Sequence, residues 1–341
     1  MDLEVLELNK TKMENKFDFN DILIQPANVS TISSRKDINP FHDGFLPLIT
    51  APMDTVINND NKELFTDLKV ITCLPRGEKN SEGFESYSLN EIEKNFIYLK
   101  PNGLYLIDIA NGHMEKLITI TKKIKRRYPK IKLMVGNVAN PETYVALSKA
   151  GADYVRIGIG NGGGCSTTVH TGVGFPMGSL VSECYFESSK LKKPAKIVAD
   201  GGMQNYSDII KALALGADYV MVGSLFNKAI ESCGDNYIWK HIKVSQSIAD
   251  WAYKNKIPVY KKFRGMSTKE VQKKWGKEVL TTSEGVVRFR RVEYTLQQWV
   301  ENFEAYLRSA MSYSNAKTLE EFISYADTIQ ITNNAYKRFN K

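Results

Sequence analysis

The sequence around Cys165 has the features of a reactive thiol. An apolar run, residues 154–160, leads into a loop that is dense in glycine and ends in Cys165-Ser-Thr-Thr. Glycines let a backbone turn sharply and approach a ligand closely, and the N–H groups of such a loop attract anions. A cysteine that only fills space in a core needs neither feature. We therefore predict that Cys165 is a nucleophile and that Cys73, Cys184 and Cys233 are buried structural residues.

Two further loops have the sequence of a phosphate-binding turn. Asp200-Gly201-Gly202 and Gly223-Ser224 each follow an apolar run, and each is expected to precede a helix. A helix N-terminus attracts an anion because its first N–H groups have no partner within the helix. Glycines there also make tight turns without any ligand, but two such turns at consecutive strand ends favour a phosphate site. The sequence predicts a sugar phosphate or a nucleotide, with Asp200 at the ribose hydroxyls.

Residues 158–163 match the dinucleotide fingerprint G-x-G-x-x-G and follow an apolar run. A Rossmann fold also needs a helix that opens at the third glycine. The chain instead continues past Cys165 into a segment that is rich in β-branched residues and glycine and poor in helix formers. We therefore favour a ligand-binding loop over a dinucleotide-binding unit.

The composition is that of a globular protein. The 341 residues, 43% of them hydrophobic, can bury one large core. Four cysteines make no disulfide framework in a chain of this length, and neither a secretory signal nor a membrane-spanning run is evident, so we expect a cytoplasmic protein. The net charge of +8 comes from lysines spread along the chain, which favours neither nucleic acid nor membrane as a partner. The histidines are scattered, which predicts no transition-metal site: His42, His113, His170 and His241.

Apolar runs with helix-like segments between them predict a parallel β/α series. Continuous apolarity is typical of parallel strands that are buried on both faces. At least seven such strands favour a (β/α)8 TIM barrel over an open doubly wound sheet. The predicted strands are 48–53, 70–74, 104–110, 131–138, 154–160, 196–202 and 219–224, with 261–265 as the candidate for the eighth. The predicted crossover helices are 114–127, 141–150 and 206–215.

We expect a polar leader over residues 1–16 and one barrel domain over 17–341 that ends in helices at 296–312 and 318–325. The carboxyl ends of barrel strands gather on one face, where active sites are built. Several predicted strands end in polar or glycine-rich residues: Asp54, Asp108, Asn111, Asn137, the Cys165 loop, Asp200 and Ser224. The sequence therefore predicts one site on that face.

Motifs along nearly the whole chain resemble those of the IMP dehydrogenase and GMP reductase family. The matching segments are 17–23, 51–56, 136–138, 158–165, 171–174, 199–202, 222–224 and 264–267. The resemblance implies a barrel, usually a homotetramer, in which the cysteine attacks C2 of a purine nucleotide to form a covalent thioimidate.

Three features place the chain closer to the GMP reductase branch. Only a short stretch separates Arg76 from the third strand, where IMP dehydrogenases usually carry an inserted regulatory domain. The flap, about residues 267–283, is short, and residues 108–113 and 329–334 look reductase-like. The implied reaction is GMP plus NADPH to IMP, ammonia and NADP. The alternatives are an IMP dehydrogenase that uses NAD, a reductase of a deoxy or modified purine nucleotide, and a nucleotide-binding protein without activity.

The resemblance also implies roles for individual residues. Cys165, Thr167 and Glu284 would be catalytic, with the last two relaying a proton to the leaving amine. Substrate contacts are implied for Met53, Asn137, Asp200, Gly201, Gly202, Gly223, Ser224, Arg264, Gly265, Met266 and Ser267. Contacts with the cofactor are implied for Arg76, Asp108, Asn111 and Gly112. A K⁺ ion is expected at the backbone carbonyls of Gly160, Gly162 and Cys165.

The chain departs from the family pattern in the cysteine loop. Gly163 stands where the family usually has a phosphate-binding serine, which removes a hydrogen bond worth about 1–3 kcal/mol if nothing replaces it. Gly164, Ser166, Thr168 and Thr281 also replace usual residues. The chemistry is therefore predicted more firmly than the identity of the nucleotide.

Overall fold

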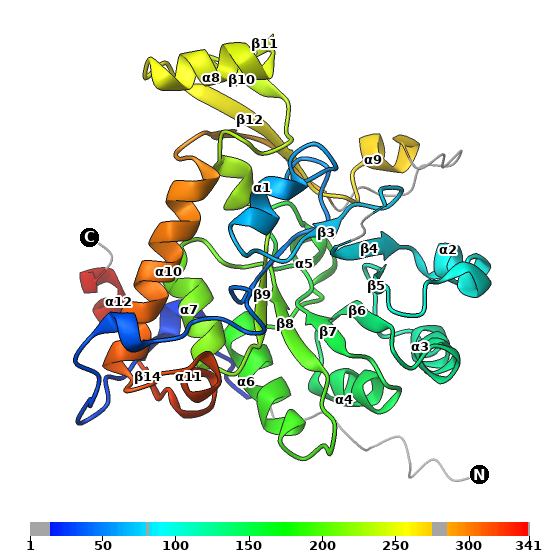
Figure 1. The fold of residues 1–341 in the computed structure, drawn as a ribbon, viewed down its shortest axis with the longest axis vertical. Coiled ribbons are helices and arrows are strands. Elements are labelled where there is room, and N and C mark those ends of the chain that lie inside the picture. Colours follow the sequence, from blue (N-terminus) through cyan, green and yellow to red (C-terminus); the bar gives the residue numbers. More distant parts are fainter. Residues whose placement is uncertain (1–13, 80–81, 275–284, 340–341) are drawn as a thin grey trace.

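The computed structural model describes residues 14–79, 82–274 and 285–339. At its centre, eight parallel strands form a sheet that closes into a barrel (Figure 1). The order of neighbours is β2-β9-β8-β7-β6-β5-β4-β3, and Ile49 in β2 bridges to Ile71, just before β3, so the two ends of the sheet meet. The strands are β2 (Leu48–Thr50), β3 (Cys73–Leu74), β4 (Phe84–Tyr87), β5 (Leu104–Asp108), β6 (Lys132–Val138), β7 (Tyr154–Ile157), β8 (Lys196–Asp200) and β9 (Tyr219–Val222). The predicted (β/α)8 barrel is confirmed.

Helices between successive strands cover the outside of the barrel (Figure 1). They are α1 (Lys62–Asp67), α2 (Leu89–Lys94), α3 (Glu115–Arg127), α4 (Pro141–Lys149), α6 (Met177–Ser188) and α7 (Tyr206–Ala214). Local sequence sets where they begin. The side chain of Asn140 accepts the N–H of Thr143 at the start of α4, where Pro141 occupies the first turn, and Asn205 accepts the N–H of Asp208 at the start of α7.

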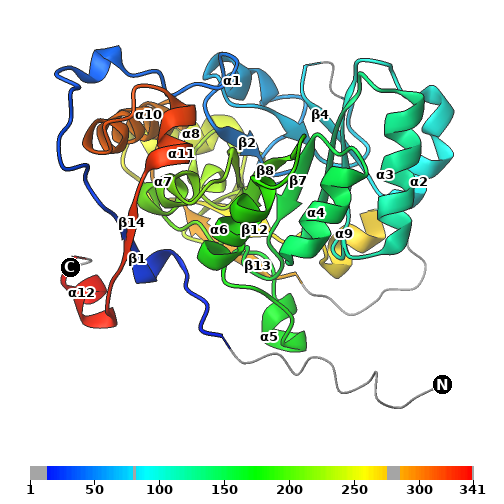
Figure 2. The ribbon, with the colours of Figure 1, turned by 90° about the horizontal axis from the view of Figure 1, so that it is seen from below.

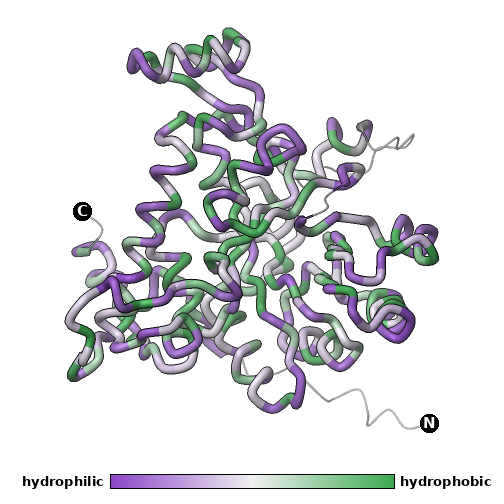
Figure 3. Tube along the Cα trace, viewed as in Figure 1, coloured by the Kyte–Doolittle hydropathy of each residue, from purple (hydrophilic) through white to green (hydrophobic). Residues whose placement is uncertain are grey.

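The apolar strands explain how two cores form around one sheet. In β5, Leu106 packs among residues inside the barrel, whereas its neighbour Ile107 packs under the helices. Val198 and Ile197 divide in the same way in β8. Successive side chains of a strand point to opposite faces, so strands buried on both faces read as continuous apolar runs. Figure 3 shows the hydrophobic strands at the centre and more polar segments on the outer helices.

The prediction of the eighth strand was wrong. The missing barrel strand is β4, which pairs with β3 and β5. It carries the polar residues Glu85 and Ser86, both buried, and these conceal it among apolar runs. The predicted residues 261–265 belong to β12 (Val259–Arg264), which is a strand of a different, antiparallel sheet.

This antiparallel sheet has the order β11-β10-β12-β13 and stands beside the barrel (Figure 1). Its strands are β10 (Asn236–Ile238), β11 (Ile242–Val244), β12 and β13 (Val287–Arg291). The helix α8 (Gln246–Lys254) packs on it through Ala249 and Ala252. Lys261 is fully buried in β12, and its ammonium group donates hydrogen bonds to the Ser232 carbonyl and Gln246 Oε1.

The remaining elements flank the barrel. They are α5 (Thr167–Thr171), α9 (Lys269–Lys274), α10 (Leu296–Tyr313), α11 (Leu319–Tyr325), α12 (Asn333–Phe339) and a small sheet of β1 (Ile22–Ile24) with β14 (Thr328–Gln330). Four 3₁₀ helices complete the described chain: η2 (Phe19–Asp21), η3 (Arg35–Asp37), η4 (Phe96–Tyr98) and η5 (Phe226–Lys228). Both predicted C-terminal helices are present as α10 and α11. None of the helices in the described ranges has the length and apolarity that a membrane crossing requires.

Candidate active site

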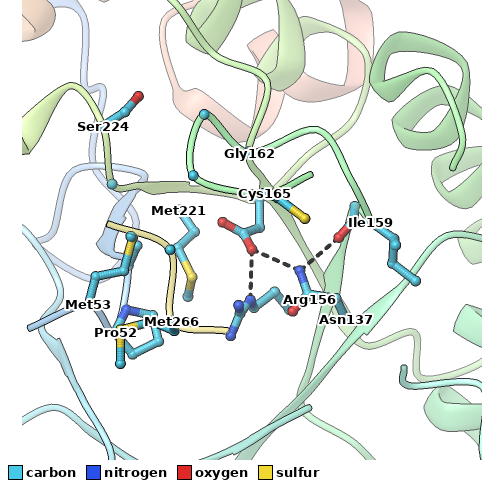
Figure 4. A pocket seen from close by; sticks show the side chains of 18 of the residues that line it. Pro52, Met53, Asn137, Arg156, Ile159, Gly162, Cys165, Met221, Ser224 and Met266 are labelled. Atoms are coloured by element: carbon cyan, nitrogen blue, oxygen red, sulfur yellow. Dashed lines mark hydrogen bonds and ion pairs between the residues drawn. The ribbon is translucent and has the colours of Figure 1, made fainter. Parts of the chain in front are cut away.

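A cavity of about 470 Å³ lies at the carboxyl ends of the barrel strands (Figure 4). The loops after β2, β3, β5, β6, β7, β8, β9 and β12 all contribute to its wall. Figure 4 shows Met53, Met221 and Met266 on one side and Asn137 and Ile159 on the other, with Cys165 between them. The predicted site on this face of the barrel therefore corresponds to a real cavity.

Among the described cysteines, Cys165 is the one that lines this cavity. Its thiol lies 3.2 Å from the Thr167 hydroxyl, and its N–H donates to the Gly162 carbonyl at 2.9 Å. The other three cysteines do not line the cavity. Burial raises the pKa of Cys73 and Cys233 to about 12, and it raises the pKa of Cys184 as well, so these thiols stay protonated. Cys73 and Cys184 are buried as predicted, whereas Cys233 is half-buried.

The cysteine loop is held in place by close approaches of glycine backbone. Gly158 has φ +121°, and a Cβ there would lie 2.4 Å from the Asp200 carbonyl. Gly201 has φ +85°, and a Cβ there would lie 2.8 Å from the Gly162 nitrogen. Side chains at either position would push the loops after β7 and β8 apart.

After Cys165 the chain forms the short helix α5, which the sequence analysis did not expect (Figure 2). Helix α5 has five residues, ends at Gly172 in the left-handed conformation, and projects away from the barrel. Its first residue, Thr167, lines the cavity. The helix begins beyond the cysteine rather than at the third glycine of the fingerprint, which is unlike a Rossmann turn.

Glu284 lies outside the described residues, as do Thr281 and residues 275–283 of the predicted flap. Its neighbour Gly285 is described and forms an antiparallel bridge with Cys165. The next N–H, of Val286, donates to the Gly164 carbonyl at 3.0 Å. The chain that continues from Glu284 thus runs directly beside the cysteine loop.

Arg156 organises the carboxylates inside the barrel mouth. Its Nη1 lies 2.8 Å from Asp108 Oδ1, and its Nε lies 2.9 Å from Asp200 Oδ2. Arg76 lies 3.3 Å from the second oxygen of Asp108. Burial alone would raise the pKa of Asp108, but the two guanidinium groups outweigh it and lower the pKa below its usual value. Arg156 was not predicted from the sequence, because a charge within an apolar strand gives no local sign of its partners.

Asp200 is positioned for a ligand by this network. Its Oδ2 accepts hydrogen bonds from Arg156 Nε and from Asn137 Nδ2, the latter at 2.8 Å. Its Oδ1 makes no hydrogen bond with any residue in the described ranges. One oxygen therefore fixes the carboxylate, and the other remains available to a hydroxyl donor.

The two predicted phosphate turns line the same cavity, but they lead into different kinds of helix. The Gly201-Gly202 turn leads into α7 after a short connection, as predicted. Gly223 and Ser224 lead only into the 3₁₀ helix η5, which corrects the expectation of a second α-helix. The shorter element offers a weaker N-terminal dipole, so side chains and loop N–H groups must contribute more at the second turn.

Most of the predicted substrate residues line the cavity, and so do Arg76 and Asp108. Arg264 does not. Its guanidinium pairs with Asp54 at 2.6 Å and with Glu270. Asn111 and Gly112 also lie outside the lining: Asn111 Oδ1 accepts the N–H of His113, and the Gly112 N–H donates to the Asn137 carbonyl. These three residues support the walls of the cavity in this structure.

Residues 100–340, more than half of the chain, match the IMP dehydrogenase / GMP reductase domain. The chain belongs to this family. It is 28% identical to a GMP reductase of Onchocerca volvulus over 96% of this chain and 94% of the relative. It is 27% identical to GMP reductase 2 of Mus musculus over 93% of this chain and 94% of the relative. An inosine-5'-monophosphate dehydrogenase of Chlorobaculum parvum is 33% identical, but the match covers 66% of this chain and 44% of that protein.

Membership of the IMP dehydrogenase / GMP reductase family makes the departure at Gly163 informative. Gly163 lines the cavity, and the side chain nearest to it comes from β13, outside the barrel. That side chain is Arg290, which sequence reasoning missed because it lies far along the chain in a strand of alternating polarity. The glycine at position 163 was the sequence signal that could have indicated Arg290, because a residue without a side chain leaves space for another side chain.

Proposed function

We propose that this protein is a GMP reductase-type oxidoreductase that converts GMP to IMP and ammonia with NADPH. The observation that carries the proposal is the placement of Cys165 beside Thr167 in a cavity that also contains Asp200 and both glycine turns. The relatives named GMP reductase match nearly end to end, which favours the reductase branch.

In the proposed reaction, the Cys165 thiolate adds to C2 of the purine ring. The 2-amino group then leaves as ammonia, which gives a thioimidate between Cys165 and the base. The leaving nitrogen must be protonated, because expulsion of an amide-like nitrogen anion is prohibitively slow. Thr167, whose hydroxyl contacts the thiol, and Glu284 would relay that proton. A reduced nicotinamide, when bound, would supply a hydride to C2, and the thiolate would then depart. The balance is GMP, NADPH and two protons to IMP, NADP⁺ and ammonium.

The proposed pose of the nucleotide is based on the chemistry of the cavity wall. The free oxygen of Asp200 would accept a ribose hydroxyl, and Gly202, Gly223 and Ser224 would hold the phosphate. Met266 and Ser267 would contact the base, with Met53 and Gly265 beside them.

The cofactor would occupy the side of the cavity near Asp108 and Arg76. A volume of about 470 Å³ lies within the range of small-molecule sites and accommodates a base and a nicotinamide ring together. Asp108, held ionised by Arg76 and Arg156, offers acceptor oxygens to an amide or a hydroxyl.

The backbone oxygens of Gly160, Gly162 and Cys165 are proposed to hold K⁺. Gly162 O accepts one hydrogen bond, from the Cys165 N–H, and a carbonyl oxygen has two lone pairs. The donor set fits a monovalent cation because it consists of neutral carbonyls. Such an ion would order the cysteine loop.

A homotetramer in the cytoplasm is proposed from the family resemblance, and light scattering would test the assembly.

An IMP dehydrogenase is the second candidate, favoured by the 33% identity to the Chlorobaculum parvum protein. The deciding assay monitors NADPH oxidation with GMP, dGMP, IMP or XMP, beside a reverse assay of IMP with NAD. GMP-dependent NADPH oxidation with equimolar ammonia supports the reductase. Reaction of IMP with NAD alone makes the protein a dehydrogenase. Binding of GMP without either reaction contradicts both enzymes.

A further inference from the structure

Arg290 fills the space that a side chain at position 163 would occupy. Its Nη2 lies 2.8 Å from the point where a Cβ on Gly163 would be. Ser224, at the second glycine turn, has its Oγ 3.8 Å from the same point. A guanidinium group therefore stands at the junction of the cysteine loop and the turn after β9, both of which line the cavity.

The guanidinium of Arg290 has no anionic partner in the described part of the chain. Its Cζ lies 4.7 Å from the centroid of the Phe263 ring, and its Nε is buried without a hydrogen-bond acceptor. Burial and the neighbouring Arg288 lower the pKa of Arg290. The other arginines near the cavity differ in this respect: Arg76, Arg156 and Arg264 each pair with a carboxylate.

A half-buried cation without a counterion costs stability unless a ligand supplies the negative charge. A phosphate matches this position, because a planar guanidinium donates two parallel hydrogen bonds to phosphate oxygens. The Phe263 ring restrains the side chain by a cation–π contact. An aromatic ring cannot neutralise the cation, so the attraction for an anion remains.

We propose that Arg290 binds the 5'-phosphate of the nucleotide in place of the side chain missing at Gly163. This inference rests on the proposed function, because it takes a purine nucleotide as the ligand. A serine would donate one hydrogen bond, whereas Arg290 donates two and adds a positive charge. The exchange makes recognition of the phosphate depend on the antiparallel sheet instead of the barrel loop, and it strengthens discrimination against nucleosides.

The geometry also couples the two positions. A side chain at 163 would meet the far end of the flexible Arg290 rather than backbone, so it would displace the guanidinium and leave the loop intact. Gly163→Ser should therefore bring no gain while Arg290 is present. It should restore affinity once Arg290 has been shortened or removed. The effect of one substitution on GMP affinity thus depends on the other, which two unrelated surface residues would not show.

Calorimetric titration of the full chain with GMP and with guanosine tests the inference. Arg290→Met should weaken GMP binding about 10- to 100-fold, because a charge-assisted pair is lost, and should leave guanosine binding unchanged. The double variant Arg290→Met with Gly163→Ser should recover at least about fivefold of that loss. Arg290→Lys, which keeps the charge, should fall between wild type and Arg290→Met.

The control is Arg291→Met, which removes an exposed arginine of the same strand and should leave the binding of both ligands as in wild type. Equal GMP affinity in wild type and Arg290→Met overturns the inference, and so does an equal loss for GMP and guanosine. If GMP affinity falls as stated but no NADPH is oxidised by wild type, the phosphate site stands and the proposed reaction fails. Wild type that binds no purine nucleotide overturns both.

Discussion

The barrel and the antiparallel sheet build one cavity in different ways. The barrel contributes side chains from the ends of seven strands and ties their charges together through Arg156. The antiparallel sheet closes the cysteine loop by backbone contacts at Gly265 and Gly285, and it inserts Arg290 from outside. Under the proposed function, the barrel would hold the reacting group and the ribose, and the antiparallel sheet would recognise the phosphate through Arg290.

The largest effect should come from a change to the reacting group in the barrel. Cys165→Ser should lower the rate of GMP-dependent NADPH oxidation by at least about 10³-fold, because an alcohol is a far weaker nucleophile than a thiolate. Calorimetry should show GMP affinity within about twofold of wild type. Cys233→Ser, on a cysteine that does not line the cavity, is the matched control and should keep full activity. Turnover in Cys165→Ser would remove the thiol from the mechanism.

A smaller loss should come from a change to Glu284, the carboxylate of the proposed proton relay. Glu284→Gln should slow ammonia release by about 10²- to 10³-fold, because the amide cannot relay a proton to the leaving nitrogen. GMP binding should be nearly unchanged, since the proposed role is confined to the chemical step. Parallel losses of binding and turnover would contradict the relay and make Glu284 a binding residue.

A weaker effect on GMP binding should come from a change to Asp200, the proposed ribose contact. Asp200→Asn should weaken GMP binding about 10- to 100-fold, because the free carboxylate oxygen loses its charge and Arg156 loses an ionised partner. For a nucleotide with 2',3'-dideoxyribose the loss should be much smaller. Equal losses for both ligands would show that Asp200 acts only by positioning Arg156.

The smallest effect concerns stability and belongs to the antiparallel sheet alone. Burial lowers the pKa of Lys261 from 10.5 to about 8, so the folded state binds fewer protons than the unfolded state between these pH values. The contribution of Lys261 to the free energy of unfolding therefore rises from pH 8 towards pH 10.5, by about 3 kcal/mol at most. Lys261→Met lacks this contribution.

Calorimetric melting between pH 7 and pH 10 measures the effect of Lys261. Relative to Lys261→Met, wild type should gain Tm as the pH rises above 8. Comparison with the variant removes the opposing effect of the buried thiols, which both proteins share. A constant difference in Tm over this range would contradict the lowered pKa of Lys261.

The two regions also differed in how far the sequence predicted them. Seven barrel strands were found because parallel strands buried on both faces give continuous apolar runs. The eighth, β4, was missed because Glu85 and Ser86 are buried inside it through tertiary contacts that no local pattern encodes. Residues 261–265 were assigned to the barrel instead, since a short apolar and basic run does not reveal whether its partner strand is parallel or antiparallel.

The candidate site showed the same division. Cys165, Asp200, Gly202, Gly223 and Ser224 were predicted because each belongs to a glycine-rich segment at the carboxyl end of a barrel strand, and all line the cavity. Arg156 and Arg290 were missed. Their positions depend on pairing across the barrel and on a strand from a separate sheet, and both are set by long-range packing.

The role of Cys165 as the nucleophile is tested most directly by an acid quench of the wild-type enzyme during turnover of GMP, with peptide mass spectrometry of the quenched protein. We expect a purine nucleotide attached to the peptide that contains Cys165, at up to one per chain, and no such adduct in Cys165→Ser. Turnover of GMP without any adduct on Cys165, or with the nucleotide attached to another residue, would contradict the central role of this thiol.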